Sequence, residues 1–140
     1  MADYYAHKVR DFFEAGHNCS QSVFMPLAEG RMDAGLASRL SSPFGGGIGG
    51  LEKTCGALCG GLMAIGLFIG QEGIDKDTQE RERETAVRLY DAFVEEFATD
   101  ECQVLKEMAF DNPPADGGRP CCKYVAFCAD WIADEFNLKV

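Results

Sequence analysis

Apolar residues recur at helical spacing along most of the chain. Near its start, Tyr5, Val9 and Phe13 fall on one side of a helix, with Phe12 beside them. The same spacing predicts seven helices, over residues 3–16, 19–28, 33–40, 55–70, 77–98, 101–110 and 120–136. No segment alternates between apolar and polar residues as a β-strand does, and the chain has no internal repeat. We therefore predict an all-α fold, a small helix bundle.

Two of these helices have contrasting patterns. Helix 55–70 is apolar around most of its circumference, so we expect it to lie inside the bundle. Helix 77–98 is amphipathic, with a charged opening that we expect in solvent. Its buried stripe is expected to consist of Val87, Tyr90, Val94 and Phe97.

Capping residues and breakers mark the expected helix ends. Asn18 is suited to cap helix 19–28, which Pro26 would bend or end, and Thr54 is suited to cap helix 55–70. The glycine run over residues 45–50 predicts a loop. This run contains the G-x-G-x-x-G spacing of dinucleotide-binding proteins, but no predicted strand precedes it, so we discount that function.

Length and charge narrow the class of protein. The chain has 140 residues, and 46% of them are hydrophobic, which is enough for one buried core and one domain over residues 1–140. A net charge of −10 disfavours nucleic acid and anionic membrane surfaces as partners. The N-terminus lacks the pattern of an export signal, and the apolar stretch 55–70 is too short to span a membrane, so we expect a cytoplasmic protein. The sequence leaves open whether the chain forms a homo-oligomer.

Seven cysteines require an explanation in a chain expected to reside in a reducing compartment. Four predicted helices begin with one: Cys19, Cys55, Cys102, and either Cys121 or Cys122. The positive end of a helix dipole stabilises a thiolate and lowers its pKa. If these helix starts converge, the thiolates are suited to bind a metal ion or cluster.

The local spacing of the cysteines restricts this set. No pair has the two-residue gap of zinc ribbons, ferredoxins or thioredoxin-type dithiols, so the fold must assemble any site. Cys55 and Cys59 share a helix face, whereas Cys121 and Cys122 point in different directions. We expect Cys59 and Cys128 to pack as small hydrophobic residues, and His17 to face solvent near a helix cap.

The ordered motifs resemble one known family. Asn18-Cys19-Ser20-Gln21-Ser22-Val23, the glycine run, Cys55-Gly56-Ala57-Leu58-Cys59-Gly60, Cys102 and Cys122 together resemble the C_GCAxxG_C_C family. The resemblance covers nearly the whole chain. It implies a redox-active protein whose four characteristic cysteines are Cys19, Cys55, Cys102 and Cys122, with Cys121 or Cys59 as substitutes. One departure is that the central motif reads Cys-Gly-Ala-x-x-Gly.

The resemblance also bears on cofactors. A similar domain accompanies haem in split-Soret cytochromes, where an iron–sulfur centre has been proposed, which implies that such a centre is conceivable here. This chain has no Cys-x-x-Cys-His haem site.

Three functions remain as alternatives, and whether the protein is an enzyme stays open. The four cysteines could ligate an iron–sulfur centre for electron transfer or redox sensing. They could exchange disulfides without a cofactor, with Cys55 as the attacking thiol of lowest pKa. They could instead form a structural zinc or metal-handling site. We favour the two redox functions, which require a redox partner that the sequence does not identify.

Overall fold

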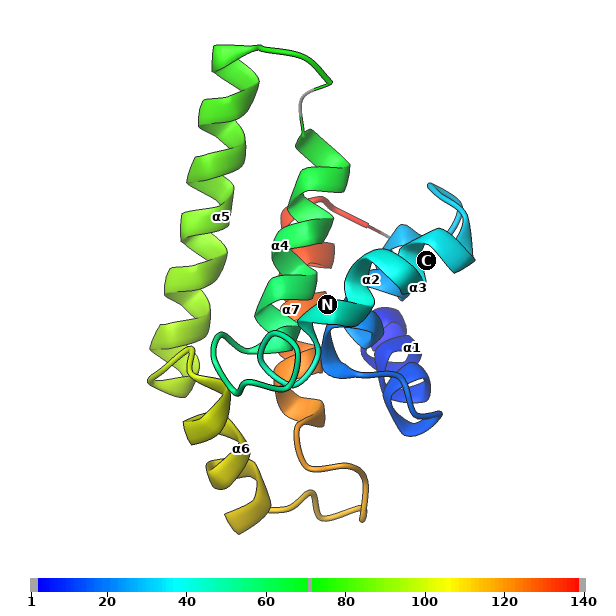
Figure 1. The fold of residues 1–140 in the computed structure, drawn as a ribbon, viewed down its shortest axis with the longest axis vertical. Coiled ribbons are helices and arrows are strands. Elements are labelled where there is room, and N and C mark those ends of the chain that lie inside the picture. The colour runs from blue at the N-terminus through cyan, green and yellow to red at the C-terminus, as the bar shows by residue number, and fades with distance from the viewer. Residues whose placement is uncertain (1–2, 71, 139–140) are drawn as a thin grey trace.

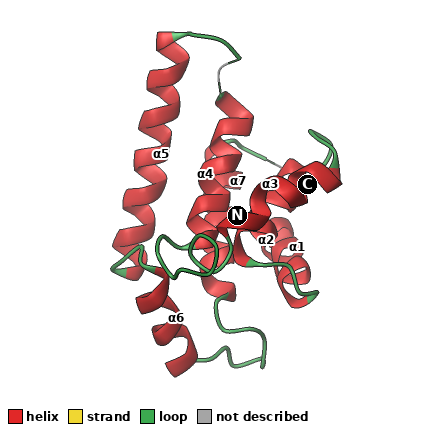
Figure 2. Cartoon of the chain, in the orientation of Figure 1, coloured by secondary structure: helices red, strands yellow, loops and turns green. Residues whose placement is uncertain are grey.

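The computed structural model describes residues 3–70 and 72–138, and within these ranges the chain is helical and contains no strand (Figures 1 and 2). The prediction of an all-α fold is confirmed. The helices are α1 (Asp3–Glu14), α2 (Cys19–Ala28), α3 (Ala34–Ser41), α4 (Gly56–Ile69), α5 (Lys76–Phe97), α6 (Cys102–Asp111) and α7 (Cys122–Glu135), with a 3-10 turn, η1 (Ser42–Phe44). No helix in the described ranges has both the length and the apolar character needed to cross a membrane.

Each helix begins within a few residues of its predicted start, but some caps differ. Asn18 caps α2 as predicted: its side chain accepts a hydrogen bond from the backbone of Gln21 at 2.9 Å. Pro26 lies inside α2 without ending it. The predicted cap Thr54 is wrong, because Cys55 itself occupies the N-cap position of α4. Thr54 instead forms an isolated β-bridge with Glu101, which is the N-cap residue of α6.

The core lies where α2, α4 and α7 meet, with α1 packed against α2 and α7. The largest buried side chains come from these helices, from α5 and, through Leu105, from α6; they include Tyr124, Phe93, Leu27 and Leu58. A small residue allows the closest approach: a Cβ at Gly60 of α4 would lie 2.7 Å from the Ser20 carbonyl oxygen of α2. Close packing of α2 on α4 therefore fixes the start of α2, where Cys19 lies.

Helices α4 and α5 are less enclosed than their patterns predicted. Only one side of α4 is buried, and Leu62, Met63, Leu67 and Phe68 remain partly exposed. The predicted stripe of α5 is partly wrong, because Val87 and Tyr90 are exposed while Leu89 and Phe93 are buried. In Figure 1, α5 extends along the outside of the molecule, so only a narrow face of it meets α4 and α7.

A buried hydrogen bond joins α6 to the core. The Tyr124 hydroxyl of α7 donates to the Leu105 carbonyl oxygen of α6 at 2.7 Å, and both residues are almost fully buried. Replacing Tyr124 with phenylalanine keeps the ring and leaves the carbonyl without this donor. We expect the free energy of unfolding to fall by about 1–2 kcal/mol, measured by urea denaturation. An unchanged midpoint and slope would contradict this role.

Candidate functional site

A short antiparallel contact brings Cys55 and Cys102 together. The Cys55 amide donates to the Asp100 carbonyl oxygen at 2.8 Å, and the Cys102 amide donates to the Lys53 carbonyl oxygen at 2.5 Å. These two bonds flank the bridge between Thr54 and Glu101. Because extended backbone pairs in a fixed register, the starts of α4 and α6 are held side by side.

The glycine run forms a tight coil against this contact. Gly46, Gly47, Gly49 and Gly50 have positive φ angles, a conformation that glycine adopts without strain, whereas the positive φ of Ile48 between them is unfavourable for a β-branched residue. Their amides and carbonyls bond within the coil and to the segment before Cys55, for example from the Lys53 amide to the Gly47 carbonyl oxygen at 3.0 Å. The prediction of a loop is confirmed, and the loop is internally hydrogen-bonded.

Glycines also leave room for two of the thiols. A Cβ at Gly56, the first residue of α4, would lie 2.7 Å from the Cys19 sulfur. A Cβ at Gly47 would lie 2.6 Å from the Cys102 Cβ. The backbone thus approaches Cys19 and Cys102 more closely than any other residue type would permit.

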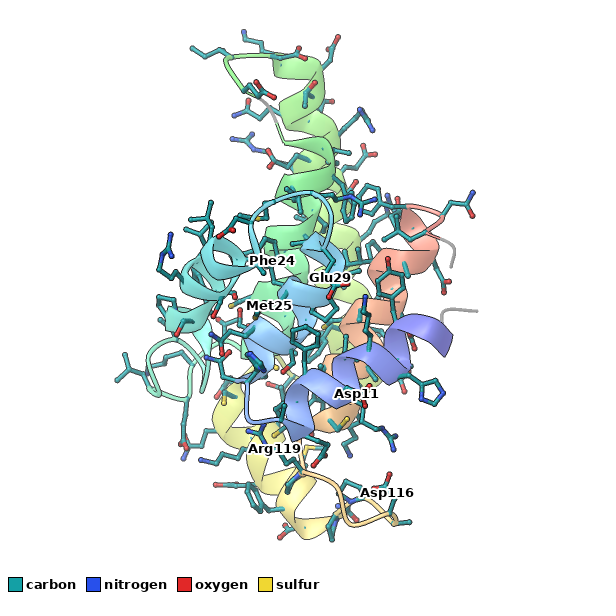
Figure 3. The ribbon with its side chains drawn as sticks, turned by 90° about the vertical axis from the view of Figure 1, so that its right-hand side faces the viewer. Asp11, Phe24, Met25, Glu29, Asp116 and Arg119 are labelled. Carbon is teal, nitrogen blue, oxygen red and sulfur yellow. The ribbon has the colours of Figure 1, made fainter. Side chains whose placement is uncertain are left out.

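Arg119 holds the segment that carries Cys121. Its guanidinium donates to the carbonyl oxygens of Phe13 and His17, the latter at 2.9 Å, and lies over the Phe13 ring at 3.7 Å from its centroid. Figure 3 shows Arg119 at the C-terminal end of α1. Pro120 and Cys121 follow directly, so α1 determines where Cys121 lies.

Three thiols line one cleft of about 260 Å³: Cys19, Cys102 and Cys121. Phe13 and Phe110 provide apolar walls, and Glu52, Lys106 and Arg119 provide charges. Lys106 forms an ion pair with Glu52 at 3.1 Å. Cys19, Cys102 and Cys121 come from the starts of α2, α6 and α7, so the cleft is assembled from distant parts of the chain.

The remaining cysteines lie in other surroundings. Cys55 is 5% exposed and sits beside the cleft residues at the start of α4, and Cys59 follows it one turn later, partly buried. Cys122 lines a separate pocket with Arg10, Glu14 and Asp116. Cys128 is fully buried, as predicted. The structure therefore places Cys121, and not Cys122, at the cleft with Cys19 and Cys102.

His17 lies outside the residues that line the cleft. It is half-buried, and its Nδ1 lies 3.2 Å from the Phe12 carbonyl oxygen.

The prediction that helix starts lower the thiol pKa values is wrong for four of these cysteines. Burial is the largest effect, and it raises the pKa of Cys121 to about 11 and the pKa of Cys55 well above its usual range. Burial also raises the pKa of Cys102 and Cys122. The Leu58 and Ala57 amides favour the Cys55 thiolate, but they offset only part of this loss of solvation. Cys55 is therefore not the thiol of lowest pKa.

The pKa of each thiol also responds to the charges of nearby groups. The charge of Cys19 raises the pKa of Cys55, Cys59, Cys102 and Cys121, and also that of the fully buried Cys128. Lys106 lowers the pKa of Cys102 and Cys121, and Arg119 lowers that of Cys121. Cys122 responds to Arg10, Glu14 and Asp116, and no other cysteine is among the causes of its shift. The charge of Cys19 therefore acts on more of the other cysteines than that of any other thiol named here.

The side chains in the structure do not fit a resident metal. Among the described residues, no three or more His, Cys, Asp or Glu side chains are arranged so that they could hold a metal ion. The four-cysteine ligand set expected from the sequence is therefore not formed as a coordination shell, and Cys122 lines a different pocket from Cys19 and Cys102.

The raised pKa values predict slow alkylation of the cleft thiols at neutral pH. Because only the thiolate reacts, we expect the rate at Cys121 to rise about tenfold per pH unit from pH 7 to 9, without levelling off. Iodoacetamide labelling followed by peptide mass spectrometry measures this rate, in a Cys122→Ser background that separates the adjacent residues. The same protein in urea is the control, and its rate should level off near pH 9. A plateau below pH 8 in the folded protein would contradict the burial effect.

The fold and the cleft define a cysteine-rich, all-α protein with clustered free thiols. A protein-family model described as "Putative redox-active protein (C_GCAxxG_C_C)" matches residues 17–135. The chain belongs to this C_GCAxxG_C_C family of redox-active proteins, and the match spans the helices that carry all seven cysteines. Comparisons with the curated proteins and with the solved structures give no match.

Proposed function

We propose that the protein is a thiol–disulfide redox protein whose active pair is Cys19 and Cys121. The observation that carries this proposal is that both thiols line one cleft, where the charge of Cys19 also raises the pKa of Cys121. Both are partly exposed, so a disulfide substrate can reach them, whereas Cys55 is enclosed. The proposal rests on the family's redox character and on this placement.

The chemistry is a two-electron exchange. The Cys121 thiolate attacks one sulfur of a substrate disulfide, which gives a mixed disulfide and releases one substrate thiol. Cys19 then attacks the Cys121 sulfur, releases the second substrate thiol and leaves a Cys19–Cys121 disulfide. Two protons pass from the protein thiols to the two substrate thiols, and the substrate is reduced as the protein is oxidised.

The charges of the cleft assist the attacking thiol. Lys106 and Arg119 favour the Cys121 thiolate and partly offset its burial. A raised pKa leaves few thiolates at neutral pH, but a thiolate of high pKa is a stronger nucleophile once it is formed. Glu52 balances Lys106, so the cleft carries one net positive charge from its two cations and one carboxylate.

Mapping of the oxidised protein tests the proposal. Anaerobically purified, reduced protein is treated with one equivalent of a small disulfide, and its free thiols and linked peptides are measured. We expect two titratable thiols to disappear and a peptide linkage between Cys19 and Cys121 to form. The linkage should persist in Cys122→Ser and disappear in Cys121→Ser.

Metal and sulfide analysis of the same preparation is the second measurement. We expect the protein to form the linkage without bound metal. Stoichiometric iron and sulfide, or stoichiometric zinc without a redox response, would overturn the proposal and favour a metal centre instead.

A further inference from the structure

Adjacent cysteines open onto two different pockets. Cys121, the N-cap residue of α7, lines the cleft that it shares with Cys19 and Cys102, called the thiol cleft below. Cys122, the first residue of α7, lines a second pocket of about 270 Å³. Of the thiols, only Cys122 is among the residues that line this second pocket. The thiols of two consecutive residues therefore line two different pockets.

The backbone at this point is the N-terminal end of α7. The Cys122 amide donates to the Arg119 carbonyl oxygen at 3.3 Å, and the Cys121 carbonyl oxygen accepts from Tyr124 at 3.1 Å, both in turn geometry. Rotation here costs fewer helix hydrogen bonds than it would in the middle of α7. Neighbouring cysteines can close a small disulfide ring that includes the peptide bond between them.

The two pockets carry opposite charge. Arg10, Glu14 and Asp116 surround Cys122, so one cation and two carboxylates give a net charge of −1. Arg10 binds Asp116 at 2.5 Å, the Gly118 amide donates to the other Asp116 oxygen at 3.0 Å, and the Arg119 amide donates to Glu14 at 2.8 Å. Figure 3 shows Asp116 farther out than Arg119 on the loop leading to α7. The net charge favours a cationic ligand at Cys122, while the thiol cleft favours an anionic one.

We propose that Cys121 and Cys122 form a disulfide relay that carries oxidising equivalents from the thiol cleft to the Cys122 pocket, where a thiol bearing a cationic group removes them. This inference rests on the proposed function, because the relay needs the Cys19–Cys121 disulfide as its starting point. In this relay the protein is reduced again at the Cys122 pocket, and not at the cleft where the substrate disulfide reacts.

The relay consists of three exchanges. The Cys122 thiolate attacks the Cys121 sulfur, the bond between Cys19 and Cys121 breaks, and Cys19 takes up the proton that Cys122 gave up. A thiol from the second pocket attacks Cys122, which forms a mixed disulfide and returns Cys121 to the thiol. A second such thiol releases Cys122, so two external thiols become one disulfide and the protein is fully reduced.

The test measures how fast two small thiols reduce the oxidised protein. Cysteamine carries an ammonium group, and 3-mercaptopropionate carries a carboxylate. In the native sequence, we expect cysteamine to reduce the Cys19–Cys121 disulfide faster than 3-mercaptopropionate does. In Cys122→Ser, we expect the cysteamine rate to be at least about tenfold lower than in the native sequence. Asp116→Asn keeps the acceptor for Gly118 and removes one negative charge, so it should reduce the preference for cysteamine.

The outcomes separate the two proposals. If the Cys19–Cys121 disulfide forms in both proteins and cysteamine reduces it at equal rates, the relay is overturned and the proposed function stands. If the disulfide forms in neither protein, both are overturned. Cys128→Ala, which changes a buried thiol away from both pockets, should leave the cysteamine rate unchanged.

Discussion

Replacing Cys19 with serine is expected to abolish the disulfide that we propose between Cys19 and Cys121 in the oxidised protein. Cys19 lines the same cleft as Cys102 and Cys121 and its charge raises the pKa of both, and serine supplies no sulfur for the linkage. Serine also fits the first position of α2, where Asn18 still caps the helix. Non-reducing peptide mass spectrometry measures the loss, and circular dichroism verifies that the helices persist.

Two matched substitutions test whether the effect belongs to Cys19. Cys55→Ser should keep the linkage, because serine is a good N-cap residue for α4 and the buried Cys55 does not line the cleft. Cys128→Ser should keep it as well, at a cost of about 1 kcal/mol for a polar group in the core. If Cys55→Ser removes the linkage as completely as Cys19→Ser does, the pairing proposed here is incorrect.

Replacing Gly47 with alanine is expected to produce the largest loss of stability at the site. The residue has a φ of +73°, and its new Cβ would lie 2.6 Å from the Cys102 Cβ and 2.7 Å from the Lys53 nitrogen. A positive φ costs about 1–2 kcal/mol for alanine, and forcing these atoms apart adds about 1–3 kcal/mol. Urea denaturation should show the combined loss.

Gly49 provides the control for this substitution. Its φ is +61°, but no atom lies within 4 Å of the position that a Cβ would take. Gly49→Ala should therefore show the conformational cost alone. Equal losses for the two variants would mean that the coil moves away from Cys102 without cost.

Much of the fold follows from local sequence signals. The helical spacing of Val125, Cys128, Ile132 and Phe136 favours one buried face for α7; the first three are buried, and Phe136, the C-cap residue, is partly buried. Asn18 and Gln21 form the capping box that the sequence around Cys19 favours. By contrast, Val87 and Tyr90 are exposed because α5 meets its neighbours along a narrow face, and the pattern within one helix does not specify how much of it a neighbour covers.

The site was less predictable because it depends on contacts between distant segments. The placement of cysteines at helix starts is a local property and was predicted. The choice between Cys121 and Cys122 depends on how Arg119 binds the end of α1, about a hundred residues earlier in the chain. The pKa values depend on burial in the assembled fold, which outweighs the helix ends.

The bridge between Thr54 and Glu101 has a consequence for how the protein responds to its surroundings. Its flanking amides, those of Cys55 and Cys102, belong to two of the clustered cysteines. Their hydrogen–deuterium exchange therefore reports directly on the separation of α4 from α6. Because the hydrogen bonds of these two amides hold the starts of α4 and α6 in register, their loss would free Cys55 and Cys102 to move relative to each other.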